Sequence, residues 1–246
     1  NPKGLALFLI GYCNLYTVNA NDNLKCKIES LADELLELKT PGFSGACWGY
    51  NFPWQSRAFY QERYSPTVVA SCFVGYALLD AYDITKNKRY LNEAVSIKDF
   101  ILKDLNRKFY DNEGLIFSYS PFDDTEVINA SLLGAKLLSR IYFYTKEKTL
   151  ISVARKAVKY ACDLQAENGS WPYGGLSYQN WIDSFHTGYN IEAIYEYQKY
   201  SEDFSFEKHI DLGISYYLNN FILSDGTPKY YNNRIYPIDS HCPAQY

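Results

Sequence analysis

The chain alternates two kinds of helical segment, and this alternation limits the folds that it can adopt. Residues 67–84 are apolar on nearly all sides, which is typical of a helix that is buried all round. Residues 89–105 carry apolar side chains at i, i+3, i+4 and i+7 spacing, which is typical of one buried and one solvated face. Together they predict an antiparallel helical hairpin. Similar pairs occupy 3–18 with 22–38, 127–145 with 149–165, and 184–200 with 206–222, and a further helix begins at Ser240.

Glycines mark near-equivalent points of three apolar helices. They are Gly75, Gly134 and Gly188, and they give a repeat period of roughly 55–60 residues. Repeated hairpins that pair a wholly buried helix with a half-buried one predict a ring, in which inner helices line the middle and outer helices surround them. The predicted fold is therefore all-α, an (α/α) toroid of repeated helical hairpins. An open solenoid is the alternative.

Charge and cysteine usage exclude several classes of protein. The formal net charge is −4 and no basic stripe is present, which argues against a nucleic-acid partner. The apolar stretch from Gly4 to Leu15 is too short to cross a bilayer and lacks the basic start of a signal peptide, so we expect no membrane span. Six cysteines without a CxxC spacing predict buried free thiols in a reducing compartment, and hence a cytoplasmic protein. The oligomeric state is not specified by any of these features.

The long loops should gather at one end of the ring, because each joins an outer helix to the next inner helix. Aromatic residues make up 17% of the chain, and rings of this kind pack on sugar rings or fill half-buried positions. Arg57 suits the carboxylate of an acidic sugar, or pairs with a loop acid. Asp123 and Asp124 precede a helix, and we expect at least one to be its N-cap. The predicted substrate-binding residues are Trp48, Tyr50, Arg57, Tyr119, Asn129, Trp171, Tyr173, Trp181 and Tyr230.

Acids and imidazoles at two helix starts are the catalytic candidates. Asp183 and His186 have the spacing of an N-cap and its third helical residue, so Asp183 is either a cap alone or part of a site. An imidazole in general titrates near neutral pH, so His186 is either a proton-transfer group or a satisfied core histidine. Asp239 and His241 repeat this order one hairpin later. Glu192 stands on an otherwise apolar helix, where it predicts a buried acid that is ion-paired or tuned for catalysis.

No metal and no cofactor are expected. Asp183, His186, His241 and Cys242 have suitable ligand chemistry, but no two of them stand at a local spacing typical of a metal site. The sequence also has no phosphate-binding loop and no nucleophilic serine elbow.

Several segments resemble one family through nearly the whole chain. They are NPKGLALFLIGY, CWGYNFPWQSRAF, PTVVASCFVGYALLDAY, FSYSP, GSWPYG, WIDSFHTGYNIEA and DGTPKYYNNRIYPIDSHCPAQ. The family is an uncharacterised bacterial group found in capsule and lipopolysaccharide gene sets, and it is related to six-hairpin glycosidase-like toroids. QAENGSW is also similar to the Gln-x-x-x-Gly-x-Trp turn of squalene-cyclase and prenyltransferase-type toroids. Members often carry the name of an aminolevulinate dehydratase, but that enzyme is an α/β barrel with a Schiff-base lysine, which an all-helical pattern does not fit.

The resemblance implies a ring of six hairpins, of which residues 1–246 supply about four to four and a half. We therefore expect a single toroid domain that is a fragment of a longer chain. It further implies an enzyme of bacterial polysaccharide metabolism that acts on a uronic acid or related sugar. Three reactions stay open: an epimerase with His186 and His241 as bases, a hydrolase with Asp183 and Asp239 as the carboxylate pair, or a lyase whose base is a tyrosine or His186. The alternative is a module that binds a glycan or a lipid-linked sugar without chemistry.

Overall fold

The computed structural model describes residues 1–57, 59–110 and 113–245. The chain folds into two compact units. Unit 1 comprises Asn1–Asn106 with Tyr119–Asp123, and unit 2 comprises Arg107–Ser118 with Asp124–Tyr246. Each unit is described separately below.

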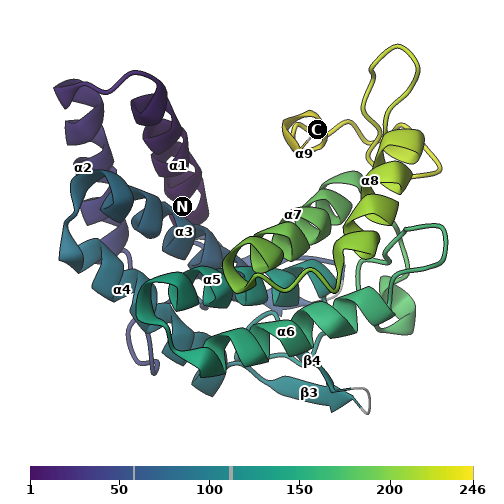
Figure 1. Ribbon diagram of the computed structural model, residues 1–246, viewed down its shortest axis with the longest axis horizontal. Coiled ribbons are helices and arrows are strands. Elements are labelled where there is room, and N and C mark those ends of the chain that lie inside the picture. The colour runs from purple at the N-terminus through teal and green to yellow at the C-terminus, as the bar shows by residue number, and fades with distance from the viewer. Residues whose placement is uncertain (58, 111–112, 246) are drawn as a thin grey trace. The chain divides into compact units, whose positions relative to one another are not determined.

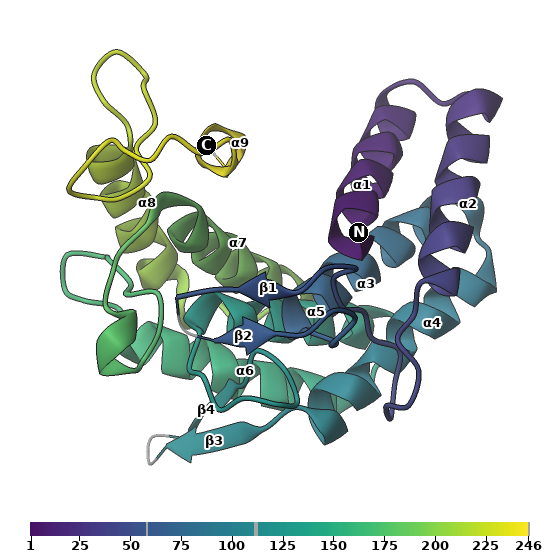
Figure 2. The same cartoon turned by 180° about the vertical axis from the view of Figure 1, so that it is seen from behind.

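Unit 1 consists of two helical hairpins and one small β-hairpin (Figures 1 and 2). Helix α3 packs on α1 and on α4, and α1 also packs on α2. The elements are α1 (Pro2–Val18), α2 (Asp22–Glu37), β1 (Trp54–Gln55), β2 (Tyr60–Gln61), α3 (Val68–Thr85) and α4 (Lys88–Asp99), which continues into a π-helical turn at Phe100–Asp104.

Unit 2 repeats the hairpin arrangement and adds a second β-hairpin. Helix α5 packs on α6 and α7, α7 packs on α8, and the short α9 contacts α7. The elements are β3 (Arg107–Tyr110), β4 (Gly114–Phe117), α5 (Ile128–Thr145), α6 (Lys148–Asp163), a 3-10 turn at Ser177–Gln179, α7 (Ser184–Ser201), α8 (Glu207–Phe221) and α9 (His241–Gln245).

The predicted wholly buried helices are observed as mostly buried in α3 and α5 but not in α1 and α7, where 4 of 17 and 8 of 18 residues are buried. Twelve of the 18 residues of α3 and 14 of the 18 residues of α5 are buried. Three hairpins also turn in the same way, because the residue that ends the inner helix adopts a left-handed conformation. These residues are Lys86, Lys146 and Glu202, with φ between 58° and 60°. The shared turn supports the predicted repeat for these three hairpins, whereas α1 ends at Asn19 with φ of −146°.

Three details differ from the sequence expectations. The connection between the helices predicted at 89–105 and 127–145 contains two strands, β3 and β4, which pair in the register Arg107↔Phe117. The helix expected over 89–105 is α-helical only to Asp99. The N-cap expectation for Asp123 and Asp124 is wrong, because α5 begins after Val127 without a side-chain cap. Asp123 instead holds its own loop by accepting hydrogen bonds from the backbone N–H groups of Tyr119 and Ser120.

The structure bears differently on the expected absence of a membrane span and on the expected burial of the cysteines. In the described part of the chain, α3 is long and apolar enough by composition to cross a membrane, and 67% of this window is buried within the protein. Core helices of globular proteins share that property, so the expectation of no membrane span stays a prediction. All six cysteines are free thiols, and Cys26 is the exposed one among them.

Candidate active site

Asp183 is both a helix cap and the partner of an imidazole. It is the N-cap of α7, where its Oδ1 accepts a hydrogen bond from the His186 backbone N–H at 3.0 Å. Its Oδ2 lies 2.7 Å from His186 Nδ1 and accepts a second bond from Trp181 Nε1 at 3.0 Å. The Asp183 side chain is fully buried, whereas 21% of the His186 side chain is exposed. The Asp183 carboxylate therefore both caps α7 and holds the His186 ring, the two roles between which the sequence did not decide.

Asp239 and His241 form a second acid–imidazole pair at the start of α9. Asp239 Oδ1 lies 2.7 Å from His241 Nδ1 and also accepts from the His241 backbone N–H at 2.8 Å. Burial pushes the pKa of Asp239 upward, but the two hydrogen bonds from His241 and the nearby His241 and His186 imidazoles lower this pKa overall. Both side chains are partly exposed.

The ring of Phe185 connects the two pairs. Its centroid lies 4.0 Å from the His186 ring and 5.2 Å from the His241 ring. Four of the predicted catalytic residues therefore converge in unit 2, at the N-terminal end of α7. Phe185 was not selected from the sequence, since a phenylalanine at a helix start is not distinguished there from a core residue.

Aromatic side chains enclose the His186 side of this cluster. Tyr173 stacks on Trp181 at a centroid distance of 4.3 Å and meets the His186 ring edge-on at 4.8 Å. Tyr230 contacts Phe185 at 5.6 Å. Three of the predicted substrate-binding residues thus lie around the acid–imidazole pairs.

A polar contact from α8 supports the start of α7. The hydroxyl groups of Ser184 and Tyr217 lie 3.0 Å apart, and the Ser184 backbone N–H donates to the Tyr230 carbonyl. Burial raises the pKa of Tyr217, which keeps its hydroxyl protonated. Ser184 and Tyr217 were missed in the sequence because neither stands in a recognisable motif.

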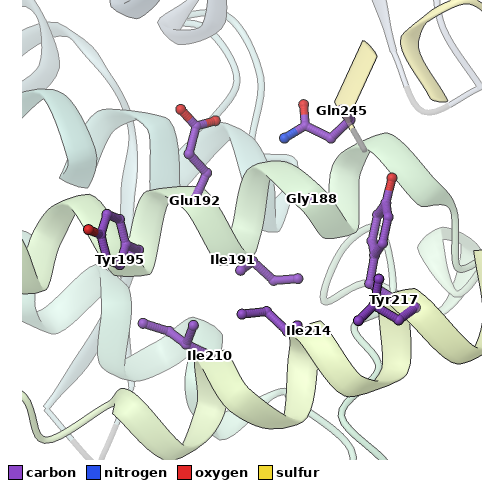
Figure 3. Close-up of a pocket in the computed structure, with 9 residues that line it drawn as sticks. Gly188, Ile191, Glu192, Tyr195, Ile210, Ile214, Tyr217 and Gln245 are labelled. Atoms are coloured by element: carbon purple, nitrogen blue, oxygen red, sulfur yellow. The ribbon is translucent and has the colours of Figure 1, made fainter. Parts of the chain in front are cut away.

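Glu192 corrects the expectation of a buried acid. Its side chain is 45% exposed, and Oε1 lies 2.6 Å from Nζ of Lys136, which is the buried member of this ion pair. Glu192 lines a pocket of about 360 Å³ between α7 and α8, together with Ile191, Ile214 and Tyr217 (Figure 3). None of the four converging acid and imidazole residues lines this pocket.

Two predicted substrate-binding tryptophans belong to the core instead. The Trp48 side chain is fully buried, and its Nε1 donates to the Leu35 carbonyl at 2.7 Å. Trp171 is 1% exposed, and its Nε1 donates to the Ala161 carbonyl at 2.8 Å. Because both rings are enclosed and both donors are occupied, these two residues are corrected to structural roles.

The remaining predicted contacts are distributed over both units. In unit 1, Tyr119 is buried, which corrects its assignment as a substrate contact, and Tyr50 stacks on Phe52 at 5.5 Å. Burial raises the pKa of Tyr50 to about 12, although a hydrogen bond with Tyr119 opposes that shift. Arg57 is exposed. In unit 2, Asn129 is buried at the start of α5, and its Oδ1 has no hydrogen-bond partner among the described residues.

Within residues 1–57, 59–110 and 113–245, no three His, Cys, Asp or Glu side chains form a group that could hold a metal ion. Cys242 is buried beside the second acid–imidazole pair, and burial raises the pKa of its thiol, so that thiolate chemistry is disfavoured there.

No family model matches this sequence, and no curated protein sequence matches it. Solved structures do share its fold. The cellobiose 2-epimerase from Bacillus thermoamylovorans superposes with a TM-score of 0.73 at 14% identity, over 96% of this chain and 65% of that one. A sugar epimerase from a ruminal bacterium gives 0.71 at 15% identity, over 96% and 65%. The GH76 α-mannanase from Bacteroides thetaiotaomicron gives 0.68 at 13% identity, over 97% and 63%.

These similarities establish the fold class as the all-α toroid of repeated helical hairpins. The chain spans 63–65% of the length of these three structures. At 13–15% sequence identity, the similarity to these structures shows that the fold is shared but does not show that the reaction is.

Proposed function

We propose that the protein is a carbohydrate-processing enzyme in which His186 and His241 transfer protons at one carbon of a sugar. The proposal rests on one observation above all. Two imidazoles, each held at Nδ1 by its own carboxylate, both contact the ring of Phe185. The solved toroids that share the fold include a cellobiose 2-epimerase and a D-mannose isomerase, which supports a sugar substrate.

The pairing with a carboxylate specifies which ring nitrogen exchanges the proton. An ionised carboxylate only accepts hydrogen bonds, so Nδ1 of each histidine donates to its aspartate and carries a proton. Nε2 is then the nitrogen that accepts a proton from substrate or returns one to it. The buried carboxylate also stabilises the imidazolium that forms when Nε2 is protonated.

The reaction most consistent with this arrangement is epimerisation or isomerisation beside a carbonyl group. One imidazole removes the proton from the carbon next to the carbonyl, and the C–H electron pair moves into an enediolate. The second imidazole, which starts as an imidazolium protonated at Nε2, gives that proton to the opposite face of the carbon, or to the neighbouring carbon in an isomerisation, so the two rings exchange protonation states. The proton count balances, and no further reactant is consumed.

Hydrolysis by Asp183 and Asp239 is a weaker proposal. Asp183 is fully buried, and its two oxygens accept three hydrogen bonds from Trp181 and His186. Asp239 is engaged twice by His241. A carboxylate that acts as a nucleophile or general acid must reach the glycosidic bond, and both groups are committed to their imidazoles instead.

The identity of the sugar is proposed from the family resemblance. We infer a uronic acid or related sugar of bacterial surface polysaccharide metabolism. Asn129, which belongs to the same unit as the acid–imidazole pairs, is the residue proposed for the carboxylate, because its side-chain NH2 group donates hydrogen bonds. Trp181 and Tyr230 would supply ring faces for the sugar, and the buried Tyr173 would support Trp181 by stacking on it.

A binding module without chemistry is the second candidate. The stacked pair of Tyr173 and Trp181 favours it, because aromatic faces are sufficient to hold a glycan. The two proposals differ in what they expect of the imidazoles, since a binding module does not need a proton acceptor.

Incubation with defined sugars tests the proposal. The panel consists of D-mannose, cellobiose, D-glucuronate, α-1,6-mannan and a polyuronate, with products followed by NMR. We expect interconversion of epimers or of an aldose and its ketose, and loss of that turnover in His186→Ala and His241→Ala. Cleavage of the polymers instead, or turnover that survives both substitutions, would contradict the assignment. Sugar binding without any turnover would favour the binding module.

A further inference from the structure

Helix α9 lies against the first turns of α7 through two contacts on one face. His241 and Gln245 are the first and last residues of α9, four residues apart, so they project from the same side of that helix. Phe185 and Gly188 are three residues apart on α7 and likewise share a side. His241 contacts Phe185, and Gln245 lies directly against Gly188 (Figure 3).

The contact at Gly188 has no room for a side chain. A Cβ atom at this position would lie 2.2 Å from Cγ of Gln245, 2.9 Å from its Cδ and 3.0 Å from its Nε2. Because Cγ is the first atom beyond the Gln245 Cβ, the end of that side chain cannot relieve the overlap alone. Either Gln245 must rotate about χ1 or α9 must move away from α7.

Between these two contacts α9 is also fixed by its middle. Cys242 is 2% exposed, and its backbone N–H donates to the Asp239 carbonyl at 3.1 Å. The Cys242 thiol forms a hydrogen bond with the Ser184 hydroxyl and therefore lies at the start of α7. Burial raises the pKa of this thiol, and the hydrogen bond opposes that shift. His241 and Gln245 are joined by one helical turn, so we expect a displacement of Gln245 to displace His241 as well.

We propose that Gly188 is a positioning residue for His241. By having no side chain, it lets Gln245 pack on α7, and that contact holds the Asp239–His241 pair beside Phe185. The expected effect of Gly188 on turnover rests on the proposed function. The expected effect of Gly188 on the position of His241 does not depend on any substrate. The contact of Gln245 with Gly188 also gives a local reason for one of the three glycines that mark the repeat.

Three variants test the positioning role through the histidine ring signals. The chain has three histidines, so the imidazole NMR spectrum holds three sets of signals, which single substitutions assign. In the native protein, we expect the ring current of Phe185 to shift the signals of His186 and His241, because both rings lie close to it. Gly188→Ala is expected to move the His241 signal toward its value in a short peptide, and Gly188→Ala with Gln245→Ala to restore most of the native shift. Gly11→Ala is the matched control, because it is a helical glycine whose added Cβ meets no atom within 4 Å.

Activity on whichever sugar of the panel is turned over supplies the second readout. We expect at least a tenfold fall in kcat for Gly188→Ala, recovery in the double variant and no change in Gly11→Ala. An unchanged His241 signal in Gly188→Ala, or a folded double variant that does not recover that signal, would overturn the positioning role. If the signals respond as expected while no sugar is turned over, the positioning role stands and the proposed reaction fails. If the signals do not respond but His186→Ala abolishes turnover, the reaction stands and the positioning role fails.

Discussion

Asp183 binds the backbone and the ring of the same residue, His186, with its two carboxylate oxygens. The cap contact fixes where α7 begins, and the ring contact fixes how the imidazole is turned. Helix formation and orientation of the proposed proton-transfer group are therefore coupled through one side chain.

Substitution of Asp183 by Asn separates these two roles. Asn is as good an N-cap as Asp, so the free energy of unfolding should change by less than about 1 kcal/mol. The amide cannot replace the carboxylate as the acceptor that stabilises an imidazolium, so turnover should fall by about 10–100-fold. Urea unfolding and steady-state kinetics measure the two effects. Asp183→Ala is the control that loses both, with a stability cost of about 1 kcal/mol for the cap. Full activity of Asp183→Asn would remove the orienting role.

The four tryptophans offer a matched pair of substitutions. Trp181→Phe keeps a ring that can stack on Tyr173 but removes the donor to Asp183. It should lower turnover by about 10-fold, as loss of an outer partner of a site residue does, with little change in unfolding free energy. Trp171→Phe removes the bond to the Ala161 carbonyl and leaves a gap in the core. It should cost about 1–3 kcal/mol of stability and leave turnover of the folded protein unchanged. Lower turnover in Trp171→Phe together with lower stability in Trp181→Phe would contradict the assignment of Trp181 to the site and Trp171 to the core.

The lowered pKa of Asp239 makes its contribution to stability pH-dependent. An aspartate whose pKa is lower in the folded than in the unfolded chain stabilises the fold above the unfolded value of about 3.9. This contribution is lost as the pH falls through the lower, folded pKa. Native Asp239 should therefore be more stabilising than Asn at pH 7, and the difference should vanish in strong acid. Urea unfolding of Asp239→Asn and of the native protein across this pH range measures it. A constant difference at all pH values would mean that Asp239 acts through packing alone.

Thiol exposure predicts a single fast reaction with iodoacetamide in the folded protein. Cys26 is exposed, whereas the other five cysteines are buried. Burial raises the pKa of Cys47 to about 12, which further suppresses its thiolate. Mass spectrometry should show one modified thiol in native buffer, none in Cys26→Ser and six after denaturation. A second fast thiol in native buffer would place another cysteine at the surface.

The sequence predicts the helices better than it predicts which side chains face the site. The apolar periodicities locate seven helices to within two residues of their observed ends, and the eighth, predicted at 89–105, is α-helical only to Asp99. Glu192 shows the limit. An acid on an apolar helix suggests burial, but the angular position of Glu192 on α7 and the presence of Lys136 on α5 decide its exposure. Trp171 is similar, because only the packing of unit 2 shows that its ring is enclosed.

The acid–imidazole pairs could be predicted because each is local. Asp183 with His186 and Asp239 with His241 stand three and two residues apart, so one turn of backbone brings them together. Their convergence around Phe185 depends on the placement of α9 against α7, which no short-range pattern encodes. The small β-hairpins were missed for a related reason, since strands of two to four residues carry little periodicity.

The central claim is that His186 and His241 exchange protons with a carbon of a sugar. Turnover in D2O tests it most directly, on the sugar of the panel that the native protein converts, with deuterium at each carbon followed by NMR. The account predicts deuterium at the carbon beside the carbonyl in the product, no incorporation with His186→Ala or His241→Ala, and normal incorporation with His209→Ala, whose ring contacts Gln165 instead. Conversion without deuterium at that carbon, or unchanged incorporation in His186→Ala, would contradict it.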